Sequence, residues 1–557
     1  MDIILFLIGS YIIYLSYFIF GNFIYQIYFE KDGILSLKEI TLLSIIILSF
    51  IGFVVNFIFP LNQYVNLIIL SLCLFIFFFK KKQKVQNIFI LSLFFCLILF
   101  LVIGFSRNPE DANLYHNSFI ALINNDKISF GITNLHYRFG WTSLIQYLSA
   151  LSYLPDISPH LIIIQNNFFY CLIILIFFEY VKKDFDNKEY LLCSYSLLCI
   201  SYMALKFSKF SDWGIDLIPA ILTMYVTLIS FKIFLRDRFY FINVYPFLLI
   251  LIFFIFFNRT TYIFICLLPL IFLLCQHLTF KDIFKTNLIV IFFIITVLYL
   301  GKNFINTSCL IYPIYFTCVE TSWLASDSSD LNVQDIYLIA KAWSMGISDS
   351  NYTMNYQTYI SNFNWLSTWL SKHFLKVIEK IFSFYAFILF VFSIIIFYLK
   401  NKKFKLTHIS NSYYYLTIFF IFGSIFWFIN SPLFRYGSGF LIVLSVLIIT
   451  PLIAIIISKL EVRFKDISNY LLIFFIIILF TKNLTRIYND KEDNFLPNTF
   501  KNVEMKEKVI SGYKLYFFNN YQMCYYPKYS PCFKDDINHI KQIKKKFGYK
   551  FYNIIPD

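Results

Sequence analysis

Long apolar runs recur along the whole chain, and they constrain its fold more than any other feature of the sequence. Many of these runs reach the ~20 residues that a helix needs to cross a bilayer. Of the 557 residues, 59% are hydrophobic and only 14% are charged, whereas soluble domains carry about 25% charged residues. A helix satisfies its own backbone hydrogen bonds in lipid. The sequence therefore predicts an all-α fold, a polytopic bundle of transmembrane helices.

Length and hydropathy predict about fourteen spans. Their cores are expected at residues 2–22, 41–59, 64–79, 87–105, 159–181, 190–205, 214–231, 241–257, 261–276, 287–301, 379–399, 413–429, 437–458 and 467–482. The chain would then consist of a transmembrane bundle, residues 1–482, and a small outer cap, residues 483–557. Two large outer loops, 106–158 and 302–377, would belong to the bundle, and the loops are expected to be helical.

The distribution of basic residues predicts the orientation of the bundle. With these spans, 21 Lys and Arg residues fall in short loops on one face, against 4 in the short loops on the other. Basic residues collect on the cytoplasmic side of membrane proteins, so both termini and all the large segments are predicted to lie outside. This bias explains much of the net charge of +15, and the charge therefore gives no indication of nucleic-acid binding.

A polar island at residues 108–116 (NPEDANLYH) follows the fourth predicted span. Glu110 and Asp111 would lie in the first turn of a helix, where acidic side chains interact favourably with the helix dipole. That is a purely structural explanation. The alternative is an active site, because ionisable groups at a membrane surface are costly to bury and usually have a function, and Tyr115 and His116 follow one turn later. Asp111, Glu110 and His116 are therefore the candidate catalytic residues.

A second polar cluster combines His136, Arg138 and Trp141 within residues 134–141. Arginine suits bidentate binding of phosphate, and we expect a flat aromatic ring to suit a sugar face or a prenyl chain. Anchoring at the membrane interface would explain the aromatic residues alone. The apolar stretch 144–154 that follows is expected to be a re-entrant or interfacial helix lying against the bundle.

Charged residues recur at the outer ends of later spans: Lys209, Asp212, Asp216, Arg259 and Arg435. Asp216 is expected to enter the membrane, where an unpaired carboxylate is costly, with Lys206 or Lys209 as its partner. Several basic groups at one depth would form a site for a lipid-linked phosphate or diphosphate. The alternatives are a structural ion pair at a helix mouth and binding of acidic lipid headgroups.

Four of the 11 cysteines fall in predicted outer segments: Cys309, Cys318, Cys524 and Cys532. In an oxidising compartment, two close pairs favour the disulfides 309–318 and 524–532, with free thiols or cross-pairing as alternatives. No neighbouring histidine has the spacing of a zinc site, so no structural metal is expected here. A disulfide loop around Pro313 would form a rigid lid or pocket wall, and residues 325–375 are expected to hold amphipathic helices over the site.

The acidic pair Glu110–Asp111, opening a large early outer loop, resembles the GT-C superfamily. These are membrane glycosyltransferases that use polyprenyl- or dolichyl-phosphate sugars. Four ordered segments, together with the terminal cysteine pair, more closely resemble a bacterial family of GT-C-like membrane proteins found among surface-polysaccharide genes: DANLYH (111–116), NLHYRFG (134–140), CLIYP (309–313) and FRYGSG (434–439). The resemblance covers roughly residues 85–535. The acidic loop here follows the fourth predicted span, whereas in the simplest GT-C pattern it follows the first.

The resemblance implies transfer of a sugar from a polyprenyl-phosphate donor to a glycan or lipid acceptor, at the outer face of a bacterial cytoplasmic (inner) membrane. It implies that Asp111 acts as general base on the acceptor hydroxyl or positions that acceptor. Glu110 or Asp212 would hold a divalent cation, Mg²⁺ or Mn²⁺, that neutralises the leaving phosphate. His116 and His136 would orient the acceptor or the carboxylate.

In the same scheme Arg138, Arg259 and Arg435 bind the phosphate as negative charge develops on it. Two other functions are also compatible with the sequence. A polysaccharide polymerase or ligase of the O-antigen type also uses lipid-diphosphate substrates and essential arginines, and Arg435 fits it. A non-enzymatic transporter of lipid-linked glycans should show polar residues in mid-span and broken helices in matching halves, and the sequence has few mid-span charges.

Overall fold

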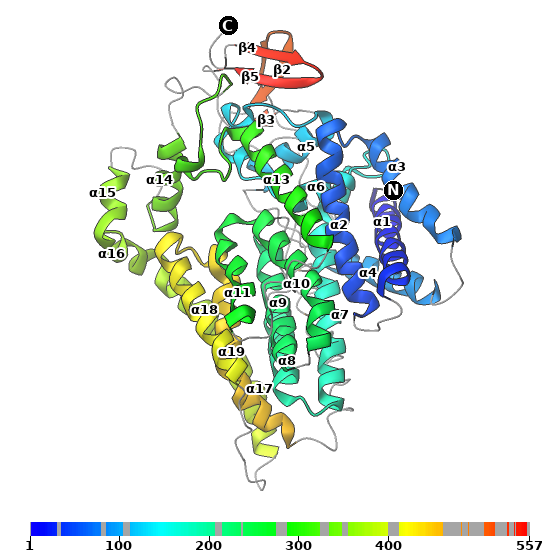
Figure 1. The fold of residues 1–557 in the computed structure, drawn as a ribbon, viewed down its shortest axis with the longest axis vertical. Helices are drawn as coiled ribbons and strands as arrows, with labels where there is room; N and C mark the ends of the chain where they lie inside the picture. The colour runs from blue at the N-terminus through cyan, green and yellow to red at the C-terminus, as the bar shows by residue number, and fades with distance from the viewer. Residues whose placement is uncertain are drawn as a thin grey trace.

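The computed structural model describes residues 2–29, 35–79, 85–103, 112–205, 214–235, 238–274, 287–323, 333–347, 355–398, 411–459, 481, 488, 506–517, 532–533, 540 and 542–553. These residues are mostly helical, and short strands follow near the C-terminus. The long helices run side by side, and the strands gather at the upper end of the molecule as drawn in Figure 1.

The α-helices are α1 (Asp2–Ile24), α2 (Leu37–Ile58), α3 (Gln63–Phe75), α4 (Val85–Ile103), α5 (Asn117–Asn125), α6 (Leu144–Leu151), α7 (Gln165–Asp186), α8 (Tyr190–Leu205), α9 (Leu217–Leu235), α10 (Arg238–Asn258), α11 (Leu268–Leu274), α13 (Asn287–Thr307), α14 (Val333–Ser344), α15 (Tyr356–Ile360), α16 (Leu366–Trp369), α17 (Leu375–Tyr398), α18 (Asn411–Asn430) and α19 (Phe434–Ser458). Shorter helical turns that shape the candidate site are η3 (Ala112–His116), η4 (Ile132–Asn134), η5 (Tyr137–Gly140) and η8 (Thr260–Leu267). The strands are β1 (Lys506–Ile510), β2 (Tyr513–Phe517), β3 (Cys532–Phe533), β4 (Gln542–Lys546) and β5 (Tyr549–Asn553).

Within the described residues, five helices are long and apolar enough to cross a membrane: Asp2–Ile27, Leu37–Ile58, Leu217–Leu235, Tyr413–Asn430 and Phe434–Ser458. The predicted helical membrane protein is thus confirmed in its general character. The predicted number of about fourteen spans is not supported, because several other apolar runs form helices of only 10–17 residues, shorter than the ~20 that a bilayer requires. The last expected span, 467–482, lies outside the described residues except for Thr481.

Polar residues between the apolar runs explain where helices begin. Ser36 caps α2: its hydroxyl accepts a hydrogen bond from Glu39 N at 3.4 Å, and the Glu39 carboxylate accepts one from Ser36 N at 2.7 Å. This reciprocal capping box satisfies two backbone donors that the helix itself leaves unpaired. Asn62 caps α3 in a simpler way, by accepting from Val65 N.

Helix α9 lies at the centre of the bundle, and α18 lies at its edge. Of the apolar window of α9, 94% is buried, against 33% for α18. Helices α7, α8, α10 and α19 pack around α9 (Figure 1). The exposed side chains of α18 include Ile418, Phe422 and Ile425, as expected for a helix that faces lipid tails, which are as apolar as leucine.

Two ion pairs join helices at the end of the bundle away from the strands. Lys232 Nζ on α9 lies 2.9 Å from Asp184 Oδ1 on α7, and Lys38 Nζ on α2 lies 2.6 Å from Glu179 Oε2 on α7. The distribution of basic residues predicted Lys38 and Lys232 on the same face of the membrane. Their ion pairs with α7 place the start of α2 and the end of α9 beside that helix. Which side of the membrane this face meets stays a prediction.

The apolar stretch after Trp141, predicted to be a re-entrant or interfacial helix against the bundle, forms the buried helix α6. All eight residues of α6 are buried, and a Cβ added to Gly52 of α2 would come within 3.0 Å of Leu151 Cδ1. This close approach of helix α6 to α2 explains the glycine. The described part of loop 106–158 is made of short helical turns and helices, and α6 anchors it inside the bundle.

The C-terminal cap contains strands, which corrects the all-α expectation for this part of the chain. Strands β1 and β2 pair antiparallel, β3 joins β2 in parallel, and β4 and β5 form an antiparallel hairpin. The hairpin docks on the turn before η4: Phe130 N donates to Lys550 O at 2.8 Å, Tyr552 N donates to Phe130 O at 3.1 Å, and the rings of Phe130 and Phe551 stack at 4.2 Å.

Candidate functional site

A cavity of about 460 Å³ lies at the end of the bundle that the sequence predicts to face outward. Side chains from η3, η5, η8, α13, α14 and α19 line it, and its volume lies within the range of about 300–1,000 Å³ found for small-molecule sites. Arg138, Arg259 and Arg435, the three predicted phosphate-binding residues, all line this cavity, as does Trp141. Packing therefore brings together four predicted site residues from three distant segments of the chain.

Arg259 lies between a carboxylate and an aromatic ring. Its Nη1 is 2.6 Å from Asp216 Oδ1, and its Cζ is 4.2 Å from the centre of the Tyr436 ring. The other oxygen of Asp216 lies 3.8 Å from Arg435 Nε, and Arg435 Cζ lies 5.1 Å from the rings of both Tyr436 and Trp343. One carboxylate thus holds two guanidinium groups, and the three side chains together keep a positive charge.

The carboxylate of Asp216 has a different partner from the one that the sequence suggested. Lys206 and Lys209, the expected partners, lie outside the described residues, and Arg259 from the far end of α10 makes the contact instead. Asp216 and Arg259 are far apart in the sequence, so no local pattern indicated their contact. They meet because α9 and α10 pack side by side in antiparallel directions in the folded bundle (Figure 1). Ion pairing explains how a carboxylate is tolerated at the mouth of a span.

Arg138 belongs to η5, a single turn that begins at His136. The ring Nδ1 of His136 accepts a hydrogen bond from Arg138 N at 3.2 Å and so caps the turn. Arg138 Nε donates to the Tyr137 hydroxyl at 3.1 Å, and its Cζ lies 5.5 Å from the centre of the Tyr115 ring. Aromatic rings on two sides limit the positions that the guanidinium group can take at the cavity wall.

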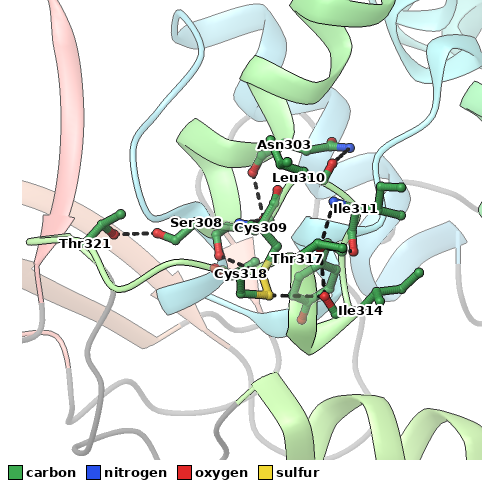
Figure 2. The surroundings of a disulfide bond; sticks show 12 residues. Asn303, Ser308, Cys309, Leu310, Ile311, Ile314, Thr317, Cys318 and Thr321 are labelled. Atoms are coloured by element: carbon green, nitrogen blue, oxygen red, sulfur yellow. Dashed lines mark hydrogen bonds between the residues drawn. A yellow bond between two sulfur atoms is a disulfide. The ribbon is translucent and has the colours of Figure 1, made fainter.

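The predicted disulfide between Cys309 and Cys318 is present and closes a loop at the end of α13 (Figure 2). Inside the loop, the Thr317 hydroxyl bonds to both the backbone nitrogen and the carbonyl of Ile311 at 3.1 Å. At the base of the loop the hydroxyls of Ser308 and Thr321 lie 2.5 Å apart. The loop therefore has internal hydrogen bonds in addition to its covalent closure.

This disulfide loop forms one wall of the cavity, as the sequence predicted, and Pro313 and Phe316 line it. The loop is attached to η5 through Tyr312, whose hydroxyl donates to Tyr137 O at 2.9 Å. The Tyr312 ring rests on Gly140, where an added Cβ would come within 2.5 Å of the ring. Only glycine allows this approach, so Gly140 sets the distance between the loop and η5.

Helix α14 supplies a basic residue that the sequence analysis did not single out. Lys341 lines the cavity together with Trp343, and its pKa is lowered from the ordinary value because burial in the wall removes water from the ammonium group. The sequence indicated an amphipathic helix within residues 325–375, but not which of its residues would face a site.

Neither of the two candidate histidines lines the cavity. His116 is buried, and its Nδ1 lies 3.0 Å from Gln146 Nε2 of α6. His136 caps η5 through its own Nδ1. Both side chains therefore make contacts that hold the cavity wall in place, and any direct role toward an acceptor stays a prediction.

Several predicted residues lie outside the described part of the chain: Glu110, Asp111, Lys209, Asp212 and Cys524. Cys532 belongs to β3, and its predicted bond to Cys524 stays a prediction. Among the described residues, no group of three or more His, Cys, Asp and Glu side chains is placed to hold a metal ion. The expected cation ligands Glu110 and Asp212 are not in that set, so the expectation of Mg²⁺ or Mn²⁺ is untested.

An apolar groove of about 500 Å³ lies beside the cavity, between η8 and α11 on one side and α18 on the other. Its walls include Phe264, Ile271, Phe419 and Phe422. Phe426 lines both the groove and the cavity. The cavity, with its three arginines, and the apolar groove are therefore neighbours that share a wall.

One family model matches residues 3–442, that of a domain of unknown function, DUF8201. No curated protein and no solved structure matches the chain. The matched region contains every residue that lines the cavity and the groove, whereas the strands of the cap follow it. On this match, which covers most of its length, the chain belongs to the DUF8201 family.

Proposed function

We propose that the protein is an integral membrane glycosyltransferase that moves a sugar from a polyprenyl-phosphate donor to a glycan or lipid acceptor on the outer face of the membrane. The observation that carries this proposal is the convergence of Arg138, Arg259 and Arg435 on one cavity. Guanidinium groups bind phosphate oxygens in pairs. They also stabilise the negative charge that grows on a leaving phosphate as the glycosidic bond breaks.

The surroundings of the arginines support a lipid-linked donor in particular. The apolar groove next to the cavity faces the flank of the bundle, where the tail of a membrane lipid would enter without crossing water. Trp141, Tyr137 and Trp343 offer flat aromatic faces inside the cavity, which suit the apolar side of a sugar ring. The phosphate would then lie at the junction marked by Phe426, with the sugar in the cavity.

In this proposal the chain supplies the chemistry through charge and position. Arg259 and Arg435 hold the phosphate, and Asp111 positions the acceptor hydroxyl or takes its proton. Glu110 or Asp212 would hold a divalent cation that helps to neutralise the leaving phosphate. The disulfide loop contributes Pro313 and Phe316 to the wall of the cavity.

The test is transfer of a radiolabelled sugar from polyprenyl-phosphate donors in proteoliposomes that contain the purified protein. Arg259→Gln and Arg435→Gln should each reduce transfer roughly 100-fold, as expected for the loss of one group that stabilises developing charge. Lys545→Gln, at an exposed position of β4, should leave transfer unchanged. Polymer growth from diphosphate-linked glycans would favour the polymerase or ligase function instead, and movement of the lipid across the membrane without transfer would favour a transporter.

A further inference from the structure

Lys302 on α13 is a fully buried lysine next to the cavity, with an exposure of 0%. Its ammonium or amine nitrogen donates a hydrogen bond to the Thr142 hydroxyl. Its other close neighbours are the rings of Phe119 and Tyr147, whose centres lie 5.5 and 5.7 Å from Nζ. Throughout the described part of the chain, no carboxylate forms an ion pair with it.

Lys232, the second buried lysine among the described residues, has a different environment. Lys232 is also buried, but it lies 2.9 Å from Asp184, so its charge is compensated. A buried ammonium ion without such a partner is costly, and burial therefore favours the neutral amine. Among the described residues, Tyr147 faces Lys302 from α6, with its ring centre 5.7 Å from Nζ, and Tyr299 lies one turn earlier on α13.

Thr142 connects this amine to the cavity. Thr142 and Asn303 line the cavity, and the Thr142 hydroxyl lies 3.5 Å from Asn303 Oδ1. A neutral amine has a lone pair, so the contact between Thr142 and Lys302 can also run from hydroxyl to nitrogen. The Thr142 hydroxyl therefore lies between the buried Lys302 amine and the cavity that a substrate would fill.

We propose that Thr142 and Lys302 form a proton relay that removes the proton of the acceptor hydroxyl during transfer. The relay rests on the proposed glycosyltransferase function, with Asp111 positioning the acceptor. The acceptor oxygen bonds to the anomeric carbon of the donor, and the bond from that carbon to the phosphate oxygen breaks, with the electron pair leaving on the phosphate. The acceptor proton passes to Thr142 Oγ1, and the hydroxyl proton of Thr142 passes to Lys302 Nζ.

The cycle closes when the Lys302 ammonium ion returns its proton through Thr142 to water or to the released phosphate. Thr142 is then the catalytic residue, because it touches the acceptor, and Lys302 acts through it. No oxidant or further reactant is needed, and each bond that forms is balanced by one that breaks. Because the buried ammonium ion has no carboxylate partner among the described residues, it gives up its proton more readily than a solvated lysine would.

The first experiment compares transfer by the wild type with Thr142→Val, Thr142→Ser and Lys302→Met across a range of pH. Thr142→Val and Lys302→Met should reduce kcat roughly 100-fold, within the contribution expected of acid–base catalysis, with KM for the donor unchanged. Thr142→Ser should restore most of the rate because it returns the hydroxyl. The fall of kcat at low pH, where the amine becomes protonated, should disappear in Lys302→Met.

Thr450→Val is the matched control. Thr450 is buried in α19 and bonds only to Val446 O of its own helix among the described residues, so this variant should keep both the rate and the pH profile. If Lys302→Met keeps the wild-type rate and pH profile, the relay is overturned while the transferase proposal stands. If the wild type transfers sugar from no polyprenyl-phosphate donor, both proposals are overturned together.

A second measurement tests the protonation state without relying on activity. The thermal midpoint of the wild type, minus that of Lys302→Met, should rise between about pH 7 and pH 10, because the unfolded lysine then binds a proton that the folded one does not. A difference that stays constant over this range would mean that Lys302 is charged in the fold. A charged lysine has no lone pair to accept a proton, and that outcome would overturn the relay.

Discussion

The guanidinium group of Arg259 and the carboxylate of Asp216 lie 2.6 Å apart at the rim of the cavity, although helices α9 and α10 separate them in the chain. Both side chains are largely covered, with exposures of 15% and 29%. The pair fixes the start of α9 to the end of α10. It also determines the charge of the site, since Asp216 offsets part of the positive charge of Arg259 and Arg435.

Substitutions at this pair should separate stability from anion binding. Arg259→Met leaves the Asp216 carboxylate without its close partner and should lower the free energy of unfolding by about 1.5–3 kcal/mol, while also weakening anion binding. Asp216→Asn should lower stability but strengthen anion binding, because it removes a negative charge. Thermal unfolding in detergent and binding of a short isoprenyl phosphate measure the two effects. Equal weakening of binding in both variants would contradict the proposed role of the pair.

The disulfide loop should matter for both the fold and the cavity. Closing a short loop of this kind stabilises a protein by about 2–3 kcal/mol, so the double variant Cys309→Ser/Cys318→Ser should unfold at a lower temperature. It should also bind an isoprenyl phosphate more weakly, because Pro313 and Phe316 lose their fixed positions in the wall. Cys73→Ser, which removes a free cysteine elsewhere, is the control. Unchanged binding in the double variant would show that the loop is not needed to shape the cavity.

Binding of anions should weaken at high pH through Lys341. Burial lowers its pKa below the ordinary 10.5, so the side chain loses its positive charge at a lower pH than a free lysine does. At pH values between the lowered pKa of folded Lys341 and its ordinary pKa, the unfolded chain keeps the Lys341 proton more tightly than the folded chain does. The free energy of unfolding should therefore rise with pH in this range. Lys341→Arg keeps its charge and should remove the pH dependence of binding. Titrations of an isoprenyl phosphate from pH 7.5 upward measure this, and identical curves for both proteins would contradict it.

The C-terminal hairpin and the turn before η4 should lie on the same side of the membrane. Lys550 pairs with Asp126 at 2.7 Å, and Tyr549 donates a hydrogen bond to Phe57 O. Exposed positions for cysteine labelling are Asn125 and Lys545 at this end, and Asn187 after α7 at the other. If the orientation is as predicted, an impermeant thiol reagent should label Asn125→Cys and Lys545→Cys in intact cells.

In the same experiment Asn187→Cys should react only after the cells are permeabilised. The unsubstituted protein gives the background labelling of the native cysteines. The reverse pattern would mean that the orientation predicted from the basic residues is inverted. Labelling of Asn125→Cys and Lys545→Cys from different sides would contradict the docking of the hairpin itself.

The acidic island gives a prediction from sequence alone. Asp111→Asn keeps the size of the side chain and removes its charge, so a variant that inserts normally should lose sugar transfer if Asp111 positions or deprotonates the acceptor. Asp2→Asn, which changes a carboxylate at the start of α1, is the control. Equal activity of Asp111→Asn and wild type would reduce Asp111 to a residue that favours the start of a helix.

The local features of the chain could be predicted because they depend on residues close in sequence. Hydrophobic composition indicated helices in a membrane, since each helix satisfies its own backbone hydrogen bonds. The short spacing of Cys309 and Cys318 indicated their disulfide, and the wall around Pro313 followed from it. The number of spans could not be predicted from hydropathy, because an apolar run indicates burial, whether that burial is in lipid or among other helices. The stretch 144–154, predicted to be a re-entrant or interfacial helix, forms α6, all of whose residues are buried.

The site required the tertiary structure because its parts come from distant segments. The sequence marked Arg138, Arg259 and Arg435 one by one, but only the packing of α10, α19 and η5 brings them to one cavity. Lys341 and Lys302 had no local signal, since a lysine in a helix or at its end is usually solvated. The sequence by itself determined that the chain forms membrane helices with charges at their ends, and the tertiary structure decided which charges meet, because burial and pairing depend on neighbours that the chain order does not specify.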